Sequence, residues 1–503
     1  MINIKFKPSG KTIAVEDGTT IAQAAIAAGL LIDQPCGGRG VCEKCKVTIY
    51  ENGVTREVLA CQTEVHTDLT ADLSGNVSGH RILIGGISRA VTLNPGTTGK
   101  YAMAYDIGTT TVASYLLDLR TGAELCTASA LNPQTKYGGD VIARINYSLE
   151  HGVDALTNDI RGAMVNLARQ CAASANIAAD EIALITIVGN TTMHHLFRGL
   201  TTETLAFAPY HAKETDARTL AAADCGFDGI CPNAVVKMFP NMAGFVGGDT
   251  VGAALAAAMD SADELTLLID IGTNGEMVLG DRNRLVTCST AAGPAFEGAM
   301  ISQGMRGADG AIDHAELTKS PDGKITVDYT VIGGGPAIGV CGSGLIDVLS
   351  ELVRTGLVDE TGKLDGDAFE IAPGVSVTAK DIRQLQLAKG AMAAGIEMLR
   401  NRLNVQERDI KRILIAGAFG SYMNPASARG IGLIPPLPLE LVHAIGNAAG
   451  QGAKLAALNI DEYERAKRLA EKMEYLELSA NPDFNDIFID HLSFDPLDVQ
   501  NAS

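Results

Sequence analysis

The chain has 503 residues, 46% of them hydrophobic, and a formal net charge of −19. This length allows roughly three domains, and the apolar content supports sizeable cores rather than a disordered chain. Because no basic run interrupts the acidic composition, we expect neither nucleic acid nor an anionic membrane surface as a partner. The N-terminal segment MINIKFKPSG lacks the apolar core of a signal peptide, and the most apolar window, residues 331–352, is rich in glycine. We therefore expect no membrane span and a cytosolic, or cytoplasmic, location.

Residues 1–85 are predicted to form an electron-carrying module. The segments INIKF and KTIAVE alternate like two strands, and TTIAQAAIAAGL follows as an Ala-rich helix with a threonine cap. The next loop carries Cys36, Cys42 and Cys45, and Cys61 lies on a later segment. Glycines allow this loop to wrap an iron–sulfur cluster with backbone amides facing the sulfides. Because a zinc site usually shows two close cysteine pairs and only one is present, we interpret the four cysteines as ligands of an iron–sulfur cluster.

The other six cysteines are interpreted as ordinary thiols. The last of them is Cys341, and Cys225 and Cys231 stand as an isolated pair without further ligand spacing. Clustering of four cysteines near the N-terminus favours metal ligation over a disulfide framework, which agrees with a cytosolic protein.

Residues 86–100 mix Gly, Pro, Ser and Thr, and they are predicted to form a linker that hinges the first module against the rest of the chain. Two lobes are predicted beyond it, at residues 101–250 and 251–503. Long amphipathic helices at 153–175 and 379–403 and buried strands ending at Gly189 and Gly417 support this division.

Each predicted lobe contains the same turn after an apolar strand. The first is AYDIGTTTV, with Asp106 and Gly108, and the second is LLIDIGTNGE, with Asp270 and Gly272. Glycine lets the backbone approach an anion, amides and hydroxyls bind phosphate oxygens, and the carboxylate can hold a hydrated Mg²⁺. One copy is weak evidence, and two unrelated turns remain the alternative. Two copies favour related lobes that face one polyphosphate.

Further strand ends and helix starts add candidate ligand contacts. Asn190 and Thr191 lie between a buried strand and a helix, where they can contact phosphate or the Mg²⁺ shell. Gly248, between Gly247 and Asp249, begins an Ala-rich helix whose N-terminus suits an anion. The adjacent residues of the His-His pair at 194–195 point about 100° apart on a helix, so we interpret them as structural or as a partner contact rather than as metal ligands.

The order Asp-x-Gly-Thr-Thr, Asp-x-Gly-Thr and Gly-x-x-Gly resembles the fold shared by acetate and sugar kinases, Hsp70 and actin. The N-terminal module resembles a β-grasp 2Fe–2S ferredoxin, with a cysteine spacing closer to the adrenodoxin type. The resulting prediction is an α+β ferredoxin domain followed by a two-lobed α/β actin-like ATPase domain. The resemblance implies phosphate contacts at Gly108, Thr109, Thr110, Thr111, Gly272, Thr273 and Asn274, adenosine contacts at Gly417, Ala418 and Gly420, and positioning of Mg²⁺ and the attacking water by Asp106 and Asp270.

A 2Fe–2S ferredoxin fused ahead of such an ATPase is similar to the reductive activators of corrinoid proteins. The resemblance covers nearly the whole chain and includes GNTTMHH, AAGPAFEG, CGSGL and IAGAFG. It implies that ATP drives one-electron reduction of inactive Co(II) corrinoid protein to Co(I), in support of corrinoid-dependent methyl transfer. The implied cofactors are a 2Fe–2S cluster, ATP and Mg²⁺. The implied partners are a corrinoid protein and a low-potential electron donor, with a homodimer as a further option.

Two departures from this family pattern are expected. We find no separate middle domain between the linker and the first lobe. Because Cys341 is the last cysteine, the chain also lacks ligands for additional C-terminal 4Fe–4S clusters.

Other functions stay open at this level. An activator of a dehydratase-type enzyme also joins this ATPase fold to iron–sulfur chemistry, although its cluster bridges two subunits and no ferredoxin domain is fused. A redox-sensing nucleotide-binding regulator is a non-enzymatic alternative. A metabolite kinase is disfavoured because phosphorylation has no use for a ferredoxin.

The small-residue loop Ala291–Glu297 is our candidate for the segment that faces cobalt. If so, Glu297→Ala should abolish corrinoid reduction while ATP binding, measured by calorimetry, stays unchanged. Loss of ATP binding in this variant would place Glu297 at the nucleotide instead.

Overall fold

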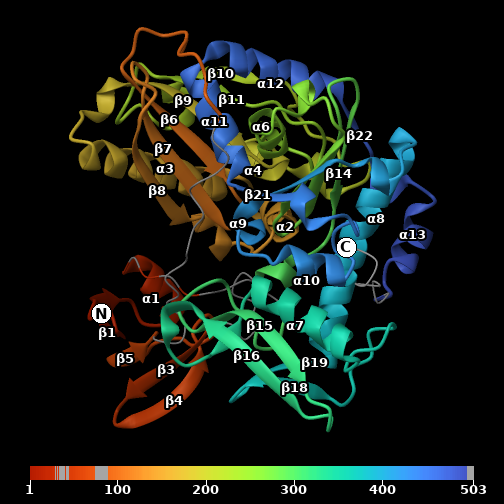
Figure 1. Cartoon of the computed structure of the whole chain (residues 1–503). Coiled ribbons are helices and arrows are strands. Elements are labelled where there is room, and N and C mark those ends of the chain that lie inside the picture. The colour runs from red at the N-terminus through yellow and green to blue at the C-terminus, as the bar shows by residue number, and fades with distance from the viewer. Residues whose placement is uncertain are drawn as a thin grey trace.

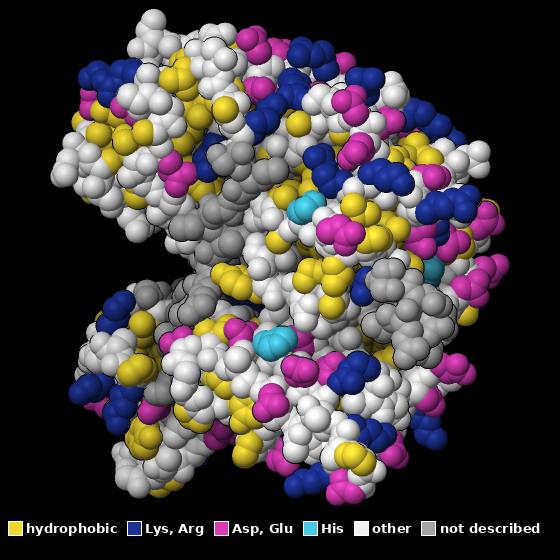
Figure 2. All heavy atoms as spheres, in the orientation of Figure 1, with side chains coloured by type: hydrophobic (Ala, Val, Ile, Leu, Met, Phe, Trp, Pro, Cys, Tyr) yellow, Lys and Arg dark blue, Asp and Glu magenta, His cyan; other side chains and the backbone are white. Residues whose placement is uncertain are grey.

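The computed structural model describes residues 1–28, 30, 32, 40, 45–73, 89–298 and 300–494. These residues form a small N-terminal unit and two larger lobes, each built on a six-stranded sheet (Figure 1). The N-terminal unit has its own core, centred on Ile4, Phe6 and Ile49. The surface is deeply indented between this unit and the first lobe (Figure 2).

The N-terminal unit is a mixed five-stranded sheet covered by one helix. Its elements are β1 (Ile2–Lys7), β2 (Thr12–Val15), α1 (Ile21–Ala27), β3 (Lys46–Glu51), β4 (Val54–Leu59) and β5 (Leu69–Asp72), with the strand order β2-β1-β5-β3-β4. Along β1, Ile2, Ile4 and Phe6 are buried and the residues between them are exposed, as the side-chain alternation of a strand requires. Strand β1 pairs antiparallel with β2 and parallel with β5. This arrangement confirms the predicted β-grasp fold.

The first lobe is organised around the sheet order β10-β11-β9-β6-β7-β8. Its elements are β6 (Tyr101–Ile107), β7 (Thr111–Asp118), β8 (Glu124–Leu131), α2 (Val141–His151), α3 (Asp154–Ser174), β9 (Ile182–Gly189), α4 (Thr191–Arg198), α5 (Glu203–Ala206), β10 (Arg218–Ala221), β11 (Val235–Met238) and α6 (Gly248–Ala256). Strands β6, β7 and β8 form an antiparallel meander, and β9 runs parallel to β6.

The second lobe has the order β21-β20-β12-β13-β14-β22, in which the first five strands repeat the arrangement of β11-β9-β6-β7-β8 and β22 is added at the other edge. Its sheet and flanking helices are β12 (Thr266–Ile271), β13 (Gly275–Gly280), β14 (Leu285–Thr290), α8 (Ala379–Leu403), β20 (Arg412–Ala416), α9 (Gly417–Gly420), α10 (Pro425–Gly430), β21 (Val442–Gly446), α11 (Ala448–Leu458), α12 (Ile460–Lys472), β22 (Met473–Tyr475) and α13 (Phe484–Asp490). Strands β12, β13 and β14 form the meander, and β20 runs parallel to β12. The prediction of two related lobes is confirmed.

An insertion between β14 and α8 extends the second lobe. It contains β15 (Ala311–Lys319), β16 (Ile325–Val331), β17 (Gly339–Val340), α7 (Gly342–Thr355), β18 (Ala368–Ala372) and β19 (Val375–Thr378). Helix α8 then starts at Ala379 because Thr378 and Asp381 form a reciprocal capping box, and it ends where Asn404 adopts a left-handed conformation. These bounds match the predicted helix at 379–403.

Helices α6 and α11 join the two lobes. They pack almost backbone to backbone, because a Cβ atom on Gly452 would lie 2.2 Å from the carbonyl oxygen of Gly252. One hydrophobic cluster includes Val251 of α6, Leu455 of α11 and Leu268 of the second sheet, together with first-lobe strands. The lobes therefore share a core along this helix pair.

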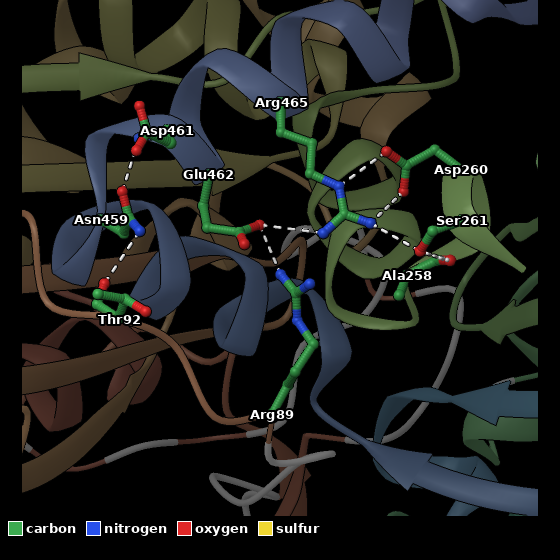
Figure 3. A network of polar contacts seen from close by, with 9 residues as sticks. All are labelled: Arg89, Thr92, Ala258, Asp260, Ser261, Asn459, Asp461, Glu462 and Arg465. Carbon is green, nitrogen blue, oxygen red and sulfur yellow. Dashed lines mark hydrogen bonds and ion pairs between the residues drawn. The ribbon is translucent and has the colours of Figure 1, made fainter.

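Residues 89–94, which belong to the predicted linker, are fixed against helix α12 (Figure 3). The Asn94 amide donates to the Leu458 carbonyl, and the Ile460 amide donates back to Asn94. The Asn459 side chain donates to the Thr92 carbonyl. This part of the expected hinge is therefore an anchored strap, because backbone pairing removes its freedom.

Arg89, the first residue of the strap, belongs to a series of linked ion pairs (Figure 3). Its guanidinium is 2.5 Å from the Glu462 carboxylate, which also accepts from Arg465 at 3.4 Å. Arg465 donates two hydrogen bonds, at 2.7 and 2.6 Å, to the carboxylate of Asp260, which lies beyond the end of α6. The strap is thus linked to both helices that connect the lobes.

Among the described residues, no helix has the length and apolar character needed to cross a bilayer.

Breaking the Arg465–Asp260 pair should destabilise the lobes. The Asp260 and Arg465 side chains are each less than one-fifth exposed, so Arg465→Met leaves a poorly solvated carboxylate. We expect the free energy of unfolding, measured by denaturant titration, to fall by about 1–3 kcal/mol.

The matched control is Arg402→Met, which removes a half-exposed partner of Glu474. Its effect should stay within about 1 kcal/mol. Equal effects of the two substitutions would contradict a special role for the partly buried Asp260–Arg465 pair.

Candidate active site

A cleft of about 340 Å³ opens where the ends of β6, β9, β12 and β20 meet. The structure brings most of the predicted contact residues into this cleft, including both repeated turns. Those that line it are Asp106, Gly108, Thr109, Thr110, Thr111, Asn190, Asp270, Gly272, Thr273, Asn274 and Gly417. Two turns that are about 160 residues apart in sequence therefore face one space.

Three predicted contact residues are placed outside the set that lines the cleft. The Thr191 hydroxyl donates to the Ala243 carbonyl at 2.6 Å and is buried. Gly248 faces Phe239, and a Cβ atom on Gly420 would lie 2.4 Å from Ile415, so both glycines serve packing. The side chain of Ala418 lies outside the described part of the structure.

The first turn is held by donors that sequence reasoning missed. The carbonyls of Gly108 and Thr110 accept from the side chain and the backbone amide of Asn132, at 2.9 and 2.8 Å. The Thr109 carbonyl accepts from Arg144. Because the N–H of a trans peptide points opposite to its C=O, these bonds direct the amides of residues 109–111 toward the cleft. Such a concave run of amides suits an anion.

The second turn places two carboxylates side by side. Asp270 on β12 pairs directly with Glu276 on β13, so like charges face each other across the hairpin. Gly417 is required here, since it has φ +86° and a Cβ atom would lie 2.7 Å from the Asp270 carboxylate. Glu276 carried no distinctive signal beyond its position at the end of the second motif.

Asp106, Asp249, Asp270 and Glu276 gather at the floor of the cleft, partly open to it but enclosed by the lobes. Burial raises the pKa of Asp106 to about 7, against the hydrogen bond from Asn447, and Asp249 adds to the rise. Burial also raises the pKa of Asp270 to about 7, with repulsion from Asp249 and Asp106. The pKa of Glu276 lies well above its usual value, first because of burial and then because of Asp249 and Asp270.

This acidic floor suits a hydrated divalent cation. Among the described residues, no three Asp, Glu, His or Cys side chains converge closely enough to hold a metal by themselves. Mg²⁺ keeps several waters and usually takes one or two carboxylates together with phosphate oxygens. The residues therefore fit a magnesium–polyphosphate complex better than a bare protein metal site.

Asp106 and Asp270 differ in their hydrogen bonding. Asn447 donates to Asp106 at 2.8 Å, and its side-chain oxygen caps α11 by accepting from the Gly450 amide. No described donor reaches the Asp270 carboxylate. Asp106 is therefore oriented, whereas Asp270 remains available to a water molecule. Asn447 could not be found from the motif because 341 residues separate it from Asp106.

Glu297 lies between the two turns and lines the cleft. Its carboxylate accepts from Thr110 at 3.3 Å and from Thr273 at 2.7 Å. It therefore bridges the lobes at the place where phosphate is expected. A cobalt-facing role for Glu297 stays a prediction.

Two of the four predicted cluster ligands lie within the described structure. The sulfurs of Cys45, at the start of β3, and Cys61 are 3.2 Å apart. Two thiols this close can serve as ligands of one iron–sulfur cluster. Cys36 and Cys42 lie outside the described residues. Cys225 and Cys231 are buried free thiols, as predicted.

Both histidines of the His194–His195 pair are structural, as predicted. His194 contacts Glu214 at 3.0 Å. His195 accepts from the Lys213 amide through Nε2, so Nδ1 carries the proton that it donates to the Thr191 carbonyl at 2.7 Å. Burial lowers the pKa of His195 to about 4, which keeps the ring neutral.

Three family models together match most of the chain. Residues 4–66 match a model described as a 2Fe–2S iron–sulfur cluster binding domain. Residues 101–262 match the RACo middle region, and residues 264–502 match the C-terminal domain of RACo, the ASKHA domain. The RACo middle region therefore spans the predicted first lobe, and no further domain was predicted between the linker and this lobe.

Two curated proteins are similar over long stretches. The corrinoid activation enzyme RamQ of Eubacterium limosum is 32% identical over 598 residues, covering 98% of this chain and 99% of the relative. A Co(II) methylated amine-specific corrinoid protein reductase of Methanosarcina barkeri is 25% identical over 425 residues, covering 78% and 77%. A solved structure described as a reductive activator for corrinoid, iron–sulfur protein has a TM-score of 0.72 and 29% identity, and the match covers 99% of both chains.

Asp270→Asn should stabilise the nucleotide-free protein at neutral pH. Folding raises the pKa of Asp270 from 3.8 to about 7, so its stabilising contribution is present below pH 4 and is lost as pH rises toward 7. We expect the variant to gain about 1–3 kcal/mol of unfolding free energy at pH 8 and to show a flatter pH profile between pH 4 and 7.

Asp118→Asn is the control of opposite sign. Arg120 lowers the pKa of Asp118, so this carboxylate contributes stability above its ordinary pKa that is lost as pH falls. The control should therefore lose a little stability at neutral pH. A loss of stability in Asp270→Asn at pH 8 would contradict the inference that the ionised Asp270 carboxylate destabilises the folded protein.

Proposed function

The chain belongs to the RACo family of reductive activators of corrinoid proteins, and from this membership we propose that it reduces an inactive Co(II) corrinoid protein to Co(I) in an ATP-dependent reaction. The main support is that the chain is similar over 98% of its length to a corrinoid activation enzyme. The chain also joins a 2Fe–2S domain to an ASKHA ATPase domain. The reaction adds one electron to the cobalt of the partner and serves corrinoid-dependent methyl transfer.

The N-terminal domain supplies the electron. When bound, the 2Fe–2S cluster accepts and donates one electron at a time. Cys45 and Cys61, 3.2 Å apart, together with Cys36 and Cys42, are the proposed ligands. The domain division that we propose is 1–85 for this unit, 86–100 for the linker, and 101–250 and 251–503 for the two lobes.

The cleft between the lobes is the proposed ATP site. Amides of the first turn, directed inward by Asn132 and Arg144, bind phosphate oxygens. Asp106, oriented by Asn447, holds hydrated Mg²⁺. Asp270, with a pKa near 7 and no described donor, is suited to take the proton of the attacking water, because a base works best with a pKa near the working pH.

ATP can drive an uphill reduction only by favouring one state of the complex. Each tenfold difference in affinity between the Co(II) and Co(I) partners corresponds to about 59 mV for a one-electron couple. A nucleotide bound to turns on both lobes has differential contacts with open and closed arrangements, which is the requirement for a population shift. We therefore propose that lobe closure around MgATP changes the affinity for the corrinoid partner.

The alternatives are less well supported. A dehydratase-type activator has no fused ferredoxin domain, whereas residues 4–66 match one. A purely sensing regulator does not account for full-length similarity to a corrinoid activation enzyme.

The proposal also covers the cellular compartment, the electron donor and the oligomeric state. The thiols outside the predicted cluster site that the structure describes, such as Cys225 and Cys231, form no disulfide. Free thiols agree with a reducing compartment, so we propose the cytoplasm. A low-potential external donor and a homodimer complete the proposal on the basis of the family resemblance.

Anaerobic absorbance spectroscopy tests the function directly. A Co(II) corrinoid protein from the same source is mixed with the chain and a low-potential reductant, with and without ATP. We expect a Co(I) band only with ATP, and a loss of at least about tenfold in its rate in Asp270→Ala and Cys61→Ser.

Matched controls separate these losses from misfolding. Cys126→Ser replaces a half-buried free thiol outside the cluster site, and Asp328→Ala replaces an exposed carboxylate on β16. Both should retain activity. Absence of Co(I) with every corrinoid partner, despite an intact cluster and bound ATP, would refute the proposed function.

A further inference from the structure

Helix α2 carries a completely buried arginine, Arg144, whose positive charge has no role in the reaction outlined above. Arg144 is the largest fully buried side chain of the described structure, with an exposed fraction of 0%. It lies in the first lobe, directly behind the turn that follows β6. A buried guanidinium is costly unless its charge is used or paired, so its position calls for a physical explanation.

Every hydrogen-bond partner of Arg144 that the structure describes is uncharged. Nε donates to the Gly138 carbonyl at 2.9 Å, and one terminal nitrogen donates to the Gln134 side chain at 3.2 Å. The same nitrogen contacts the Met193 sulfur at 3.3 Å, and the other terminal nitrogen donates to the Thr109 carbonyl. No ion pair of Arg144 occurs within the described ranges.

The charged groups around Arg144 act from longer range. Asp140 and Glu297 attract its charge, and Arg306 repels it. Burial lowers the pKa of Arg144 to about 9, so the guanidinium still carries its proton at neutral pH. A positive charge without a contacting carboxylate therefore lies behind the Thr109 peptide.

We propose that Arg144 is a positioning residue for the phosphate chain of the nucleotide, holding the Thr109 carbonyl away from the cleft and placing a positive charge behind the turn. This inference rests on the proposed ATP site and deepens it. The charge complements an anion on the other side of one peptide unit, where little water can screen it. Replacement of Arg144 should therefore affect ligands in proportion to their negative charge.

Calorimetric titration of the full chain with ATP, ADP and adenosine tests this role. Arg144→Met keeps a long side chain but removes the charge. We expect it to weaken ATP binding about tenfold or more, ADP binding less, and adenosine binding less than about twofold. Arg144→Lys should recover part of the ATP affinity because it restores the charge without the planar fork.

Arg161→Met is the matched control. Arg161 is a half-buried arginine of α3 that also donates to a backbone carbonyl, that of Phe197, but Phe197, unlike Thr109, does not line the cleft. All three affinities should be unchanged in this variant. Thermal unfolding of each variant establishes that it is folded, and Arg144→Lys carries the comparison if Arg144→Met does not fold.

The outcomes are distinguishable. Equal losses for ATP, ADP and adenosine, or no loss for ATP, would overturn the electrostatic role of Arg144 and leave the ATP site intact. A wild-type chain that binds none of the three ligands would refute the proposed site itself.

Discussion

The crowding of carboxylates at the cleft floor is the constraint on which the rest of the arrangement depends. Asp270 and Glu276 face each other across one hairpin, and Asp106 and Asp249 add to the same field. Such repulsion weakens the nucleotide-free protein and is relieved when a cation enters between the lobes. In the proposed function, the residues that destabilise the empty cleft are therefore those through which MgATP draws the lobes together. Lobe closure and nucleotide binding are then thermodynamically coupled.

The contacts of Asn447 connect the cleft to the strap at residues 89–94. Asn447 binds Asp106 and caps α11, and α11 lies against α6 at Gly252. At its far end α11 pairs with the strap through Leu458 and Asn94. A rigid shift of α11 would therefore move the segment that leads back to the N-terminal domain. The Arg89–Glu462–Arg465–Asp260 chain ties the same segment to the end of α6 (Figure 3).

Repetition made the fold accessible to sequence reasoning. The Asp-x-Gly-Thr pattern around Asp106 and Asp270 marks strand ends that the structure places at one cleft, because each aspartate lies at the end of the first strand of an equivalent meander. The bounds of α8 followed from its amphipathic run, and the structure adds the cap at Thr378 and Asp381. At the predicted helix start, Asp249 lines the cleft while Gly248 packs on Phe239, so the ligand contact of Gly248 stays a prediction. A motif gives the turn, but packing decides which of its residues is exposed.

Residues that orient the motif had no comparable signal. Asn132, Arg144 and Asn447 act by fixing a carbonyl or a carboxylate from elements far along the chain, and each is an ordinary polar residue in its own segment. Their effect depends on the direction of a peptide dipole, which no residue type encodes. The motif supplies amides and hydroxyls, but without these outer contacts the same amides could turn away from the anion. The specificity of the cleft therefore depends on tertiary contacts. Although the fold contains the same turn twice, different neighbouring residues give the two turns different electrostatic surroundings.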